Sequence, residues 1–97
     1  MGSIRSEEMD ELFKAILLLG DVEECYKFFE DVCTIKEVLD ISQRLQVAKM
    51  LKENKSYQEI SKEIGASTAT ISRVNKCLMY GSGGYELILE KLEKSEE

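Results

Sequence analysis

Small, mostly hydroxyl-bearing side chains and cations gather on one short stretch of the sequence at helical spacing. They are Thr68, Ala69, Thr70, Ser72, Arg73 and Lys76. At about 100° per residue, these positions fall on the outer face and the flanks of a single helix. Small residues near a helix start can approach base edges in the major groove, and cations further along can pair with phosphates. The pattern predicts a DNA recognition helix.

The opposite side of this predicted helix is apolar. Ile71, Val74 and Leu78 recur at three- and four-residue spacing, as expected for a helix that packs one face against a core. Ser67 directly precedes the helix, where its hydroxyl can accept one of the unpaired backbone N–H groups. Such residues would form the core of any helical hairpin, so this face indicates fold and not function.

A shorter helix is predicted just before the recognition helix. Ser56 and Glu59 have the spacing of a capping box, in which each side chain accepts the backbone N–H of the other residue. Ile60 and Ile64 follow at helical spacing, and Gly65 stands where a left-handed residue can end a helix without steric cost. Two short helices joined by a glycine turn predict a helix-turn-helix.

Charge is distributed unevenly along the chain, whose formal charge is −6. Residues 1–41 carry 4 Lys/Arg and 11 Asp/Glu, and residues 81–97 carry 2 and 5. Residues 42–80, which include the helix-turn-helix, carry 7 and 3. The basic segment suits phosphate contacts, while the acidic segments would keep other surfaces away from DNA.

The remaining residues also follow helical periodicity. With 97 residues and no proline, the chain is short enough for one small domain. Further helices are predicted over residues 7–19, 21–33, 34–52 and 85–94. Two more capping boxes are predicted, at Asp21 with Glu24 and at Thr34 with Glu37. The inner face of the long helix is predicted to contain Val38, Ile41, Leu45, Ala48 and Leu51.

The sequence therefore predicts an all-α domain of six helices over residues 1–97. Residues 1–33 have apolar faces wider than a lone helical hairpin can bury. In one interpretation these two helices wrap the helix-turn-helix as a compact monomer. In the other they pair with a second copy and present two recognition helices to successive major-groove turns. The expected parts are dimerisation helices 1–33, long helix 34–55, helix-turn-helix 56–78 and C-terminal helix 85–94.

Residues for metal binding or catalysis are scarce. Cys25, Cys33 and Cys77 form no CxxC pair and histidine is absent, which leaves too few ligands for a structural zinc site. The sequence has no Gly-rich phosphate loop and no nucleophile–base pair, which argues against an enzyme. No apolar run approaches the ~20 residues that cross a bilayer, and unpaired cysteines are typical of a cytoplasmic protein.

Three segments carry a resemblance to a known family: QRLQVAKML (43–51), SYQEISKEIGAS (56–67) and TATISRVNKCL (68–78). They resemble the Trp repressor superfamily, and within it the small Trp-repressor-like proteins of low-GC Gram-positive bacteria. The firm motifs cover about half of the chain, and the flanking helices agree in number and order. The resemblance implies an intertwined homodimer that binds double-stranded operator DNA through the second helix of the motif and represses transcription.

By position, the resemblance assigns phosphate contacts to the first helix of the motif and base contacts to the second. The phosphate contacts are Tyr57, Gln58, Ser61 and Lys62. The residues that approach base edges are Thr68, Ala69, Thr70 and Ser72. Arg73 and Lys76 complete the predicted DNA-binding face. A different function class remains open, because a helix-turn-helix can also serve as a protein-interaction module that does not bind DNA.

The resemblance also raises the question of a small-molecule effector. In the Trp repressor, bound tryptophan lies between two arginines, and the matching positions here are Thr34, Arg44, Arg73 and Cys77. Two arginines would suit a carboxylate or an aromatic ring. Val74, however, replaces a glycine that leaves room for the indole, and Cys77 replaces a serine that binds the ligand amine. Alternatively, Arg73 faces phosphate or a glutamate and Val74 packs in the core, so we expect no required cofactor.

Overall fold

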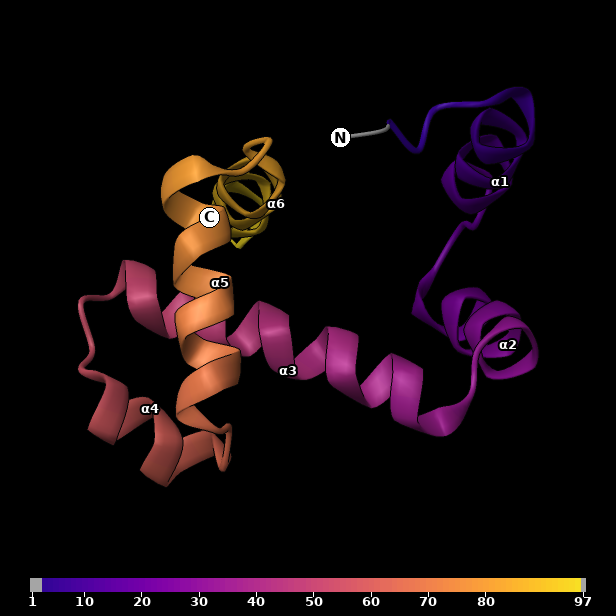
Figure 1. The fold of residues 1–97 in the computed structure, drawn as a ribbon. Coiled ribbons are helices and arrows are strands. Elements are labelled where there is room, and N and C mark those ends of the chain that lie inside the picture. Colours follow the sequence, from indigo (N-terminus) through magenta and orange to yellow (C-terminus); the bar gives the residue numbers. More distant parts are fainter. Residues whose placement is uncertain (1–2, 97) are drawn as a thin grey trace. The chain divides into compact units, whose positions relative to one another are not determined.

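The structure is a computed structural model that describes residues 3–96, and these residues form six α-helices and no strand (Figure 1). The helices are α1 (Glu7–Leu17), α2 (Val22–Val32), α3 (Ile35–Lys52), α4 (Tyr57–Ile64), α5 (Thr68–Tyr80) and α6 (Gly84–Ser95). The all-α prediction and the order of the six helices are confirmed. The chain divides into two compact units, Met1–Val38 and Leu39–Glu97, each described by itself below.

In the first unit, side-chain oxygens begin both helices. The Ser6 hydroxyl accepts the N–H of Met9 at the start of α1, and the Asp21 carboxylate accepts the N–H of Glu24 at the start of α2. The predicted capping box at Asp21 is only half formed, because the Glu24 carboxylate accepts the N–H of Gly20, at 2.8 Å, and not that of Asp21. The one-residue shift shows that the Asp21 cap fixes this helix start without a reciprocal partner.

Both helices of the first unit expose much of their apolar faces. No residue of α1 or α2 is buried in the described chain. Leu17, Val22 and Tyr26 are 82%, 71% and 60% exposed. α1 also ends two residues before the predicted position, because the N–H groups of Leu18 and Leu19 bond to carbonyls three residues back in a tightened last turn.

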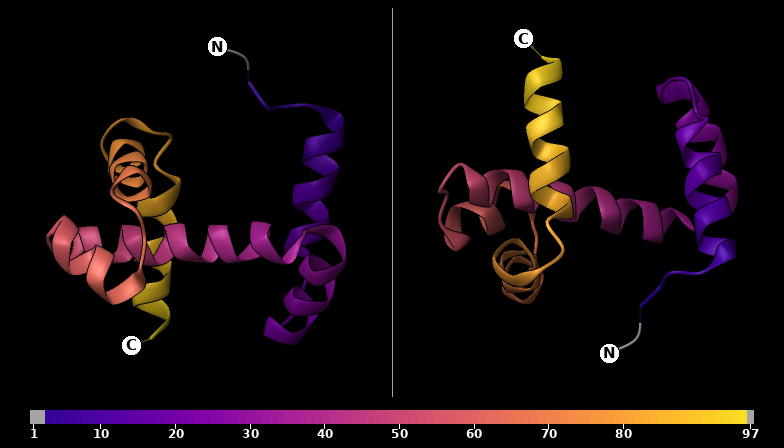
Figure 2. Two further views of the ribbon diagram at one scale, coloured as in Figure 1. Left: turned by 60° about the horizontal axis from the view of Figure 1, so that its bottom comes forward. Right: turned by 90° about the horizontal axis from the view of Figure 1, so that it is seen from above.

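The second unit contains the hydrophobic core. The fully or nearly fully buried side chains come from the C-terminal half of α3, from α4, from the turn after it, and from α5 and α6. They are Val47, Ala48, Met50, Ile60, Ala66, Ile71, Val74 and Leu89. The views in Figure 2 show α3 lengthwise and α5 nearly end-on, so α5 crosses α3 at a steep angle. One core thus holds the helix-turn-helix against both α3 and α6.

The predicted inner face of α3 is partly wrong. Val47 and Met50 are buried, although neither was assigned to that face, while Ile41 is 54% exposed. Ala48 is buried as predicted, and Leu45 packs partly buried against the core. The difference arises because the core residues contributed by α3 lie only in its last two turns, where they pack with residues of α4, α5 and α6.

The end of α3 sets the direction of the chain into α4. Asn54 adopts a left-handed conformation with φ 64°, the only non-glycine residue with positive φ among those described. The N–H of Asn54 bonds to the Leu51 carbonyl, and that of Lys55 bonds to the Met50 carbonyl. This pair of bonds is the Schellman pattern, which satisfies carbonyls at a helix end. α3 therefore ends at Lys52, as the sequence predicts.

Candidate nucleic-acid interface

The first helix of the motif, α4, begins with the predicted capping box. The Ser56 hydroxyl accepts the N–H of Glu59, and the Glu59 carboxylate accepts the N–H of Ser56. The backbone hydrogen bond from Ser56, and then the bond with its hydroxyl, lower the pKa of the Glu59 carboxyl below its ordinary value of 4.5. Glu59 is therefore held as a carboxylate, and this carboxylate is hydrogen-bonded to the backbone at the start of α4.

Gly65 ends α4 and directs the chain into α5. Its φ is 83°, a left-handed conformation, and its N–H bonds to the Ser61 carbonyl at 2.8 Å. A Cβ at this position would meet no atom within 4 Å, so the requirement for glycine comes from the backbone conformation and not from crowding. Ala66 follows and is buried at 1% exposure. The turn is therefore tied to the core immediately before the recognition helix starts.

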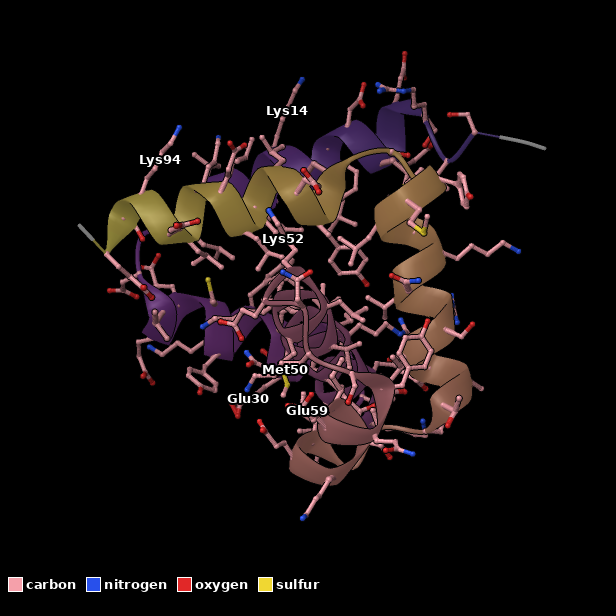
Figure 3. All side chains as sticks on the ribbon, turned by 90° about the vertical axis from the view of Figure 1, so that its left-hand side faces the viewer. Lys14, Glu30, Met50, Lys52, Glu59 and Lys94 are labelled. Atoms are coloured by element: carbon pink, nitrogen blue, oxygen red, sulfur yellow. The ribbon has the colours of Figure 1, made fainter. Side chains whose placement is uncertain are left out.

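The second helix, α5, starts at a side-chain cap and packs along one face. The Ser67 hydroxyl accepts the N–H of Thr70. Ile71 and Val74 are 0% and 1% exposed, and Leu78 packs against the same cluster. Figure 3 looks along α3 from its C-terminal end. It shows α4, α5 and α6 around that end, with side chains in the space between these helices. The inner face of α5 is therefore fixed, as the sequence predicts.

The outer surface of the motif contains most of the predicted DNA-binding residues. On α5, Thr68, Ala69, Ser72, Arg73 and Lys76 are exposed. On α4, Gln58 and Lys62 are exposed one turn apart. The other three predicted contacts are half-buried: Tyr57, Ser61 and Thr70. The motif thus brings a polar face of α4 and a polar face of α5 to the solvent around the Gly65 turn.

Cations outnumber carboxylates on the motif, and both of its carboxylates have partners within the protein. Glu59 belongs to the capping box, and Glu63 forms an ion pair with Lys55 at 3.3 Å. α5 contains two cations and no acidic residue. Within residues 3–96, Lys62, Arg73 and Lys76 form no ion pair. These exposed cations are available to an anionic partner.

Two exposed residues on the outer side of α5 escaped the sequence-based prediction. Tyr80 is 78% exposed and follows Arg73 and Lys76 at helical spacing, so it extends the same face to the end of the helix. Met79 is 63% exposed beside it. The helical spacing of Tyr80 from Arg73 and Lys76 could have placed it on the outer face. An aromatic residue at a helix end is equally typical of a core position, however, so spacing alone does not decide.

The residues of the predicted effector site have separate roles in the structure. Thr34 belongs to the first unit, where its hydroxyl accepts the N–H of Glu37 in a complete capping box. Arg44 is half-buried on α3, while Arg73 and Cys77 are exposed one turn apart on α5. Val74, between them in sequence, is 1% exposed in the core. The valine side chain therefore occupies space in the packed interior.

Over residues 3–96, no group of three or more His, Cys, Asp and Glu side chains could hold a metal ion. None of the helices formed by these residues is both long enough and apolar enough to cross a membrane.

Comparison with known proteins identifies the family. The model of the Trp repressor protein family matches residues 7–93. The chain belongs to the Trp repressor family. It is 53% identical over 93 residues to YerC of Bacillus subtilis (strain 168), described as an uncharacterized protein. The alignment covers 96% of this chain and 89% of YerC.

Solved structures of family members share the fold. A crystal structure of a TrpR-like protein from Eubacterium eligens matches with a TM-score of 0.90 and 53% identity, over 93% of each chain. A crystal structure from Staphylococcus aureus matches with a TM-score of 0.90 and 52% identity, over 93% of this chain and 90% of that one. The six helices therefore form a Trp-repressor-like fold, as the sequence resemblance implied.

Proposed function

We propose that this protein is a sequence-specific DNA-binding regulator of transcription that acts as a repressor and places α5 in the major groove as a homodimer. The main supporting observation is the outer face of α5, which presents small polar residues near its start and then Arg73 and Lys76. Membership of the Trp repressor family supports the same function.

The roles of individual residues follow from their placement on the two helices. Exposed Gln58 and Lys62 on α4 would contact phosphates, with half-buried Tyr57 and Ser61 contributing their polar ends. Thr68, Ala69 and Ser72 would approach base edges from the N-terminal half of α5. Arg73 and Lys76 would pair with phosphates along the groove. We expect no enzymatic activity, and double-stranded DNA is the proposed partner.

The homodimer is supported by the apolar surface that a single chain leaves uncovered. Leu17, Leu18 and Val22 in the first unit are 82%, 83% and 71% exposed, and Ile35 at the start of α3 is 81% exposed. Exposed apolar surface of this extent is unfavourable in water unless another surface covers it. A two-fold pair would cover it and also present two recognition helices to neighbouring half-sites.

The salt dependence of binding to mixed-sequence duplex DNA tests this proposal. A DNA-binding protein releases counterions from the phosphates, so the logarithm of its affinity falls linearly with the logarithm of salt concentration. We expect a slope of about −5 for the dimer, because Lys62, Arg73 and Lys76 of each chain would together neutralise about six phosphates. Absence of duplex binding even at low salt would instead favour a protein-interaction module with the shape of a helix-turn-helix.

A further inference from the structure

Two hydroxyl side chains at the start of α5 are hydrogen-bonded to each other. The Ser67 hydroxyl accepts the backbone N–H of Thr70 at 3.1 Å, and it donates to Oγ1 of Thr70, also at 3.1 Å. Ser67 thus uses its proton and one of its lone pairs on a single residue. The pair closes a small ring across the first turn of the helix.

The neighbouring hydroxyls on α5 differ from this pair. Thr68 and Ser72 are exposed, whereas Thr70 is half-buried. Within residues 3–96, neither the Thr68 nor the Ser72 hydroxyl forms a hydrogen bond to another part of the protein. Because both residues are exposed, each hydroxyl can bond to a base edge without breaking an internal bond.

We propose that Thr70 is a positioning residue that fixes the Ser67 cap, and that hydroxyl readout of base edges belongs to Thr68 and Ser72. The inference rests on the proposed DNA-binding function, and it assigns different roles to different hydroxyl residues at the start of α5. It changes the role given to Thr70 by the sequence resemblance, which placed it among the residues that approach bases.

The physical basis is the difference between a preformed contact and an exchangeable one. Thr70 keeps its own hydroxyl proton, but its oxygen is held by the bond that it accepts from Ser67. Turning this hydroxyl toward a base would break that bond and offset part of what the base contact gains. Fixing the first turn before binding reduces the conformational entropy lost on binding, which improves affinity for every duplex alike. Thr70 should therefore affect affinity without affecting base preference.

The geometry of α5 limits where the two reading hydroxyls can act. Thr68 and Ser72 are four residues apart, which corresponds to a rise of about 6 Å along the helix. Successive base pairs are separated by about 3.4 Å. The base pairs that these residues read should therefore lie within about two steps of each other in each half-site.

The test compares matched variants on one set of duplexes. A preferred duplex is selected from random sequences by the unmodified protein, and affinities are measured at fixed salt for it and for each single-base-pair variant. Thr70→Val removes the hydroxyl and keeps the shape, and we expect it to weaken all duplexes by one common factor of about 2–10. Thr70→Ser keeps the hydroxyl and should restore affinity.

Three further single variants and one double variant complete the comparison. Thr68→Val and Ser72→Ala should each abolish preference at one base-pair position and leave preference elsewhere unchanged. In Ser67→Ala, which removes both bonds of the pair, adding Thr70→Val should cause little further loss, because the energetic coupling between the two residues is already gone. Faster exchange of the Thr70 amide proton in Ser67→Ala would report the opened first turn.

Different outcomes would overturn different parts of this inference. A change of base preference in Thr70→Val that Thr70→Ser reverses would show that Thr70 reads a base. Unchanged preference in both Thr68→Val and Ser72→Ala would remove the reading role from those hydroxyls. If the unmodified protein binds no duplex, the proposed function fails together with the inference. In the other two outcomes the unmodified protein binds DNA, so only the inference fails.

Discussion

The Glu59 carboxylate accepts the backbone N–H of Ser56 at 3.0 Å, and the Ser56 hydroxyl accepts the N–H of Glu59 at 3.1 Å. The lowered pKa of Glu59 means that its carboxylate form stabilises the folded state. That contribution is present above the unfolded pKa of about 4.5 and is lost as pH falls through the lower folded pKa.

Glu59→Gln tests this linkage, because glutamine can keep the hydrogen bond but does not titrate. We expect the unmodified protein to be the more stable form near neutral pH, with a difference that narrows as pH falls below about 4.5. Chemical unfolding at several pH values and one protein concentration measures this difference. A difference that stays constant down to acid pH would show that the Glu59 charge does not stabilise the cap.

A second prediction concerns the core beneath the motif. Ile60 is 0% exposed, while Ile64 one turn later is only half-buried. Ile60→Ala should lower the free energy of unfolding by about 2–5 kcal/mol, the usual cost of emptying a buried aliphatic site. Ile64→Ala should cost less. If urea unfolding shows the same loss of unfolding free energy for the two variants, then Ile60 is not the more deeply packed of the two residues and this prediction is wrong.

A third prediction separates stability from DNA binding. Lys62 is exposed on α4 and forms no ion pair within the described residues. Lys62→Ala should leave thermal unfolding nearly unchanged, weaken binding to all duplexes alike, and reduce the salt slope by about one unit for each chain of the dimer. Gln58→Ala, one turn earlier, is the control, since it removes no charge and should leave the slope as it was.

A fourth prediction concerns the effector. Val74 is 1% exposed, and dense packing leaves no void to absorb a ring beside it. We expect tryptophan to bind weakly or not at all, and the protein to bind duplex DNA without it. Val74→Gly should open space there at a cost of roughly 0.5–1 kcal/mol in helix propensity, in addition to the lost core contacts. Calorimetric titration of both forms decides the question, and micromolar tryptophan binding by the unmodified protein would contradict this prediction.

A fifth prediction concerns assembly. The exposed apolar side chains of α1 and α2 lead us to expect a homodimer. Sedimentation at micromolar concentration should give roughly twice the chain mass of 11.1 kDa. A clean monomer under these conditions would show that a single chain can keep these faces exposed, and it would also weaken the proposed repressor function.

Much of the helix-turn-helix could be predicted from sequence because its determinants are local. The cap at Ser56, the left-handed Gly65 and the cap at Ser67 each depend on residues within one turn, and the structure confirms all three. Local patterns also have limits. The Asp21 and Glu24 pair has the same spacing as Ser56 and Glu59, yet the Glu24 carboxylate bonds to Gly20.

The remaining differences depend on contacts between residues far apart in sequence. Val47 and Met50 are buried because residues of α4, α5 and α6 pack against their side of α3, and helical periodicity cannot choose between two neighbouring apolar faces. Thr70 lies on a flank of α5 from which it can reach either solvent or Ser67. Only the side-chain positions show that it bonds to Ser67.

The uncovered apolar faces of α1 and α2 have a consequence for how the amount of dimer depends on the concentration of the chain. In the proposed dimer, side chains such as Leu17 and Val22 become covered only when two chains meet. At low abundance the amount of dimer follows the square of the chain concentration, so halving synthesis would lower it about fourfold. If the dimer is the DNA-binding form, operator occupancy would then change more steeply with chain concentration than it would for a monomer.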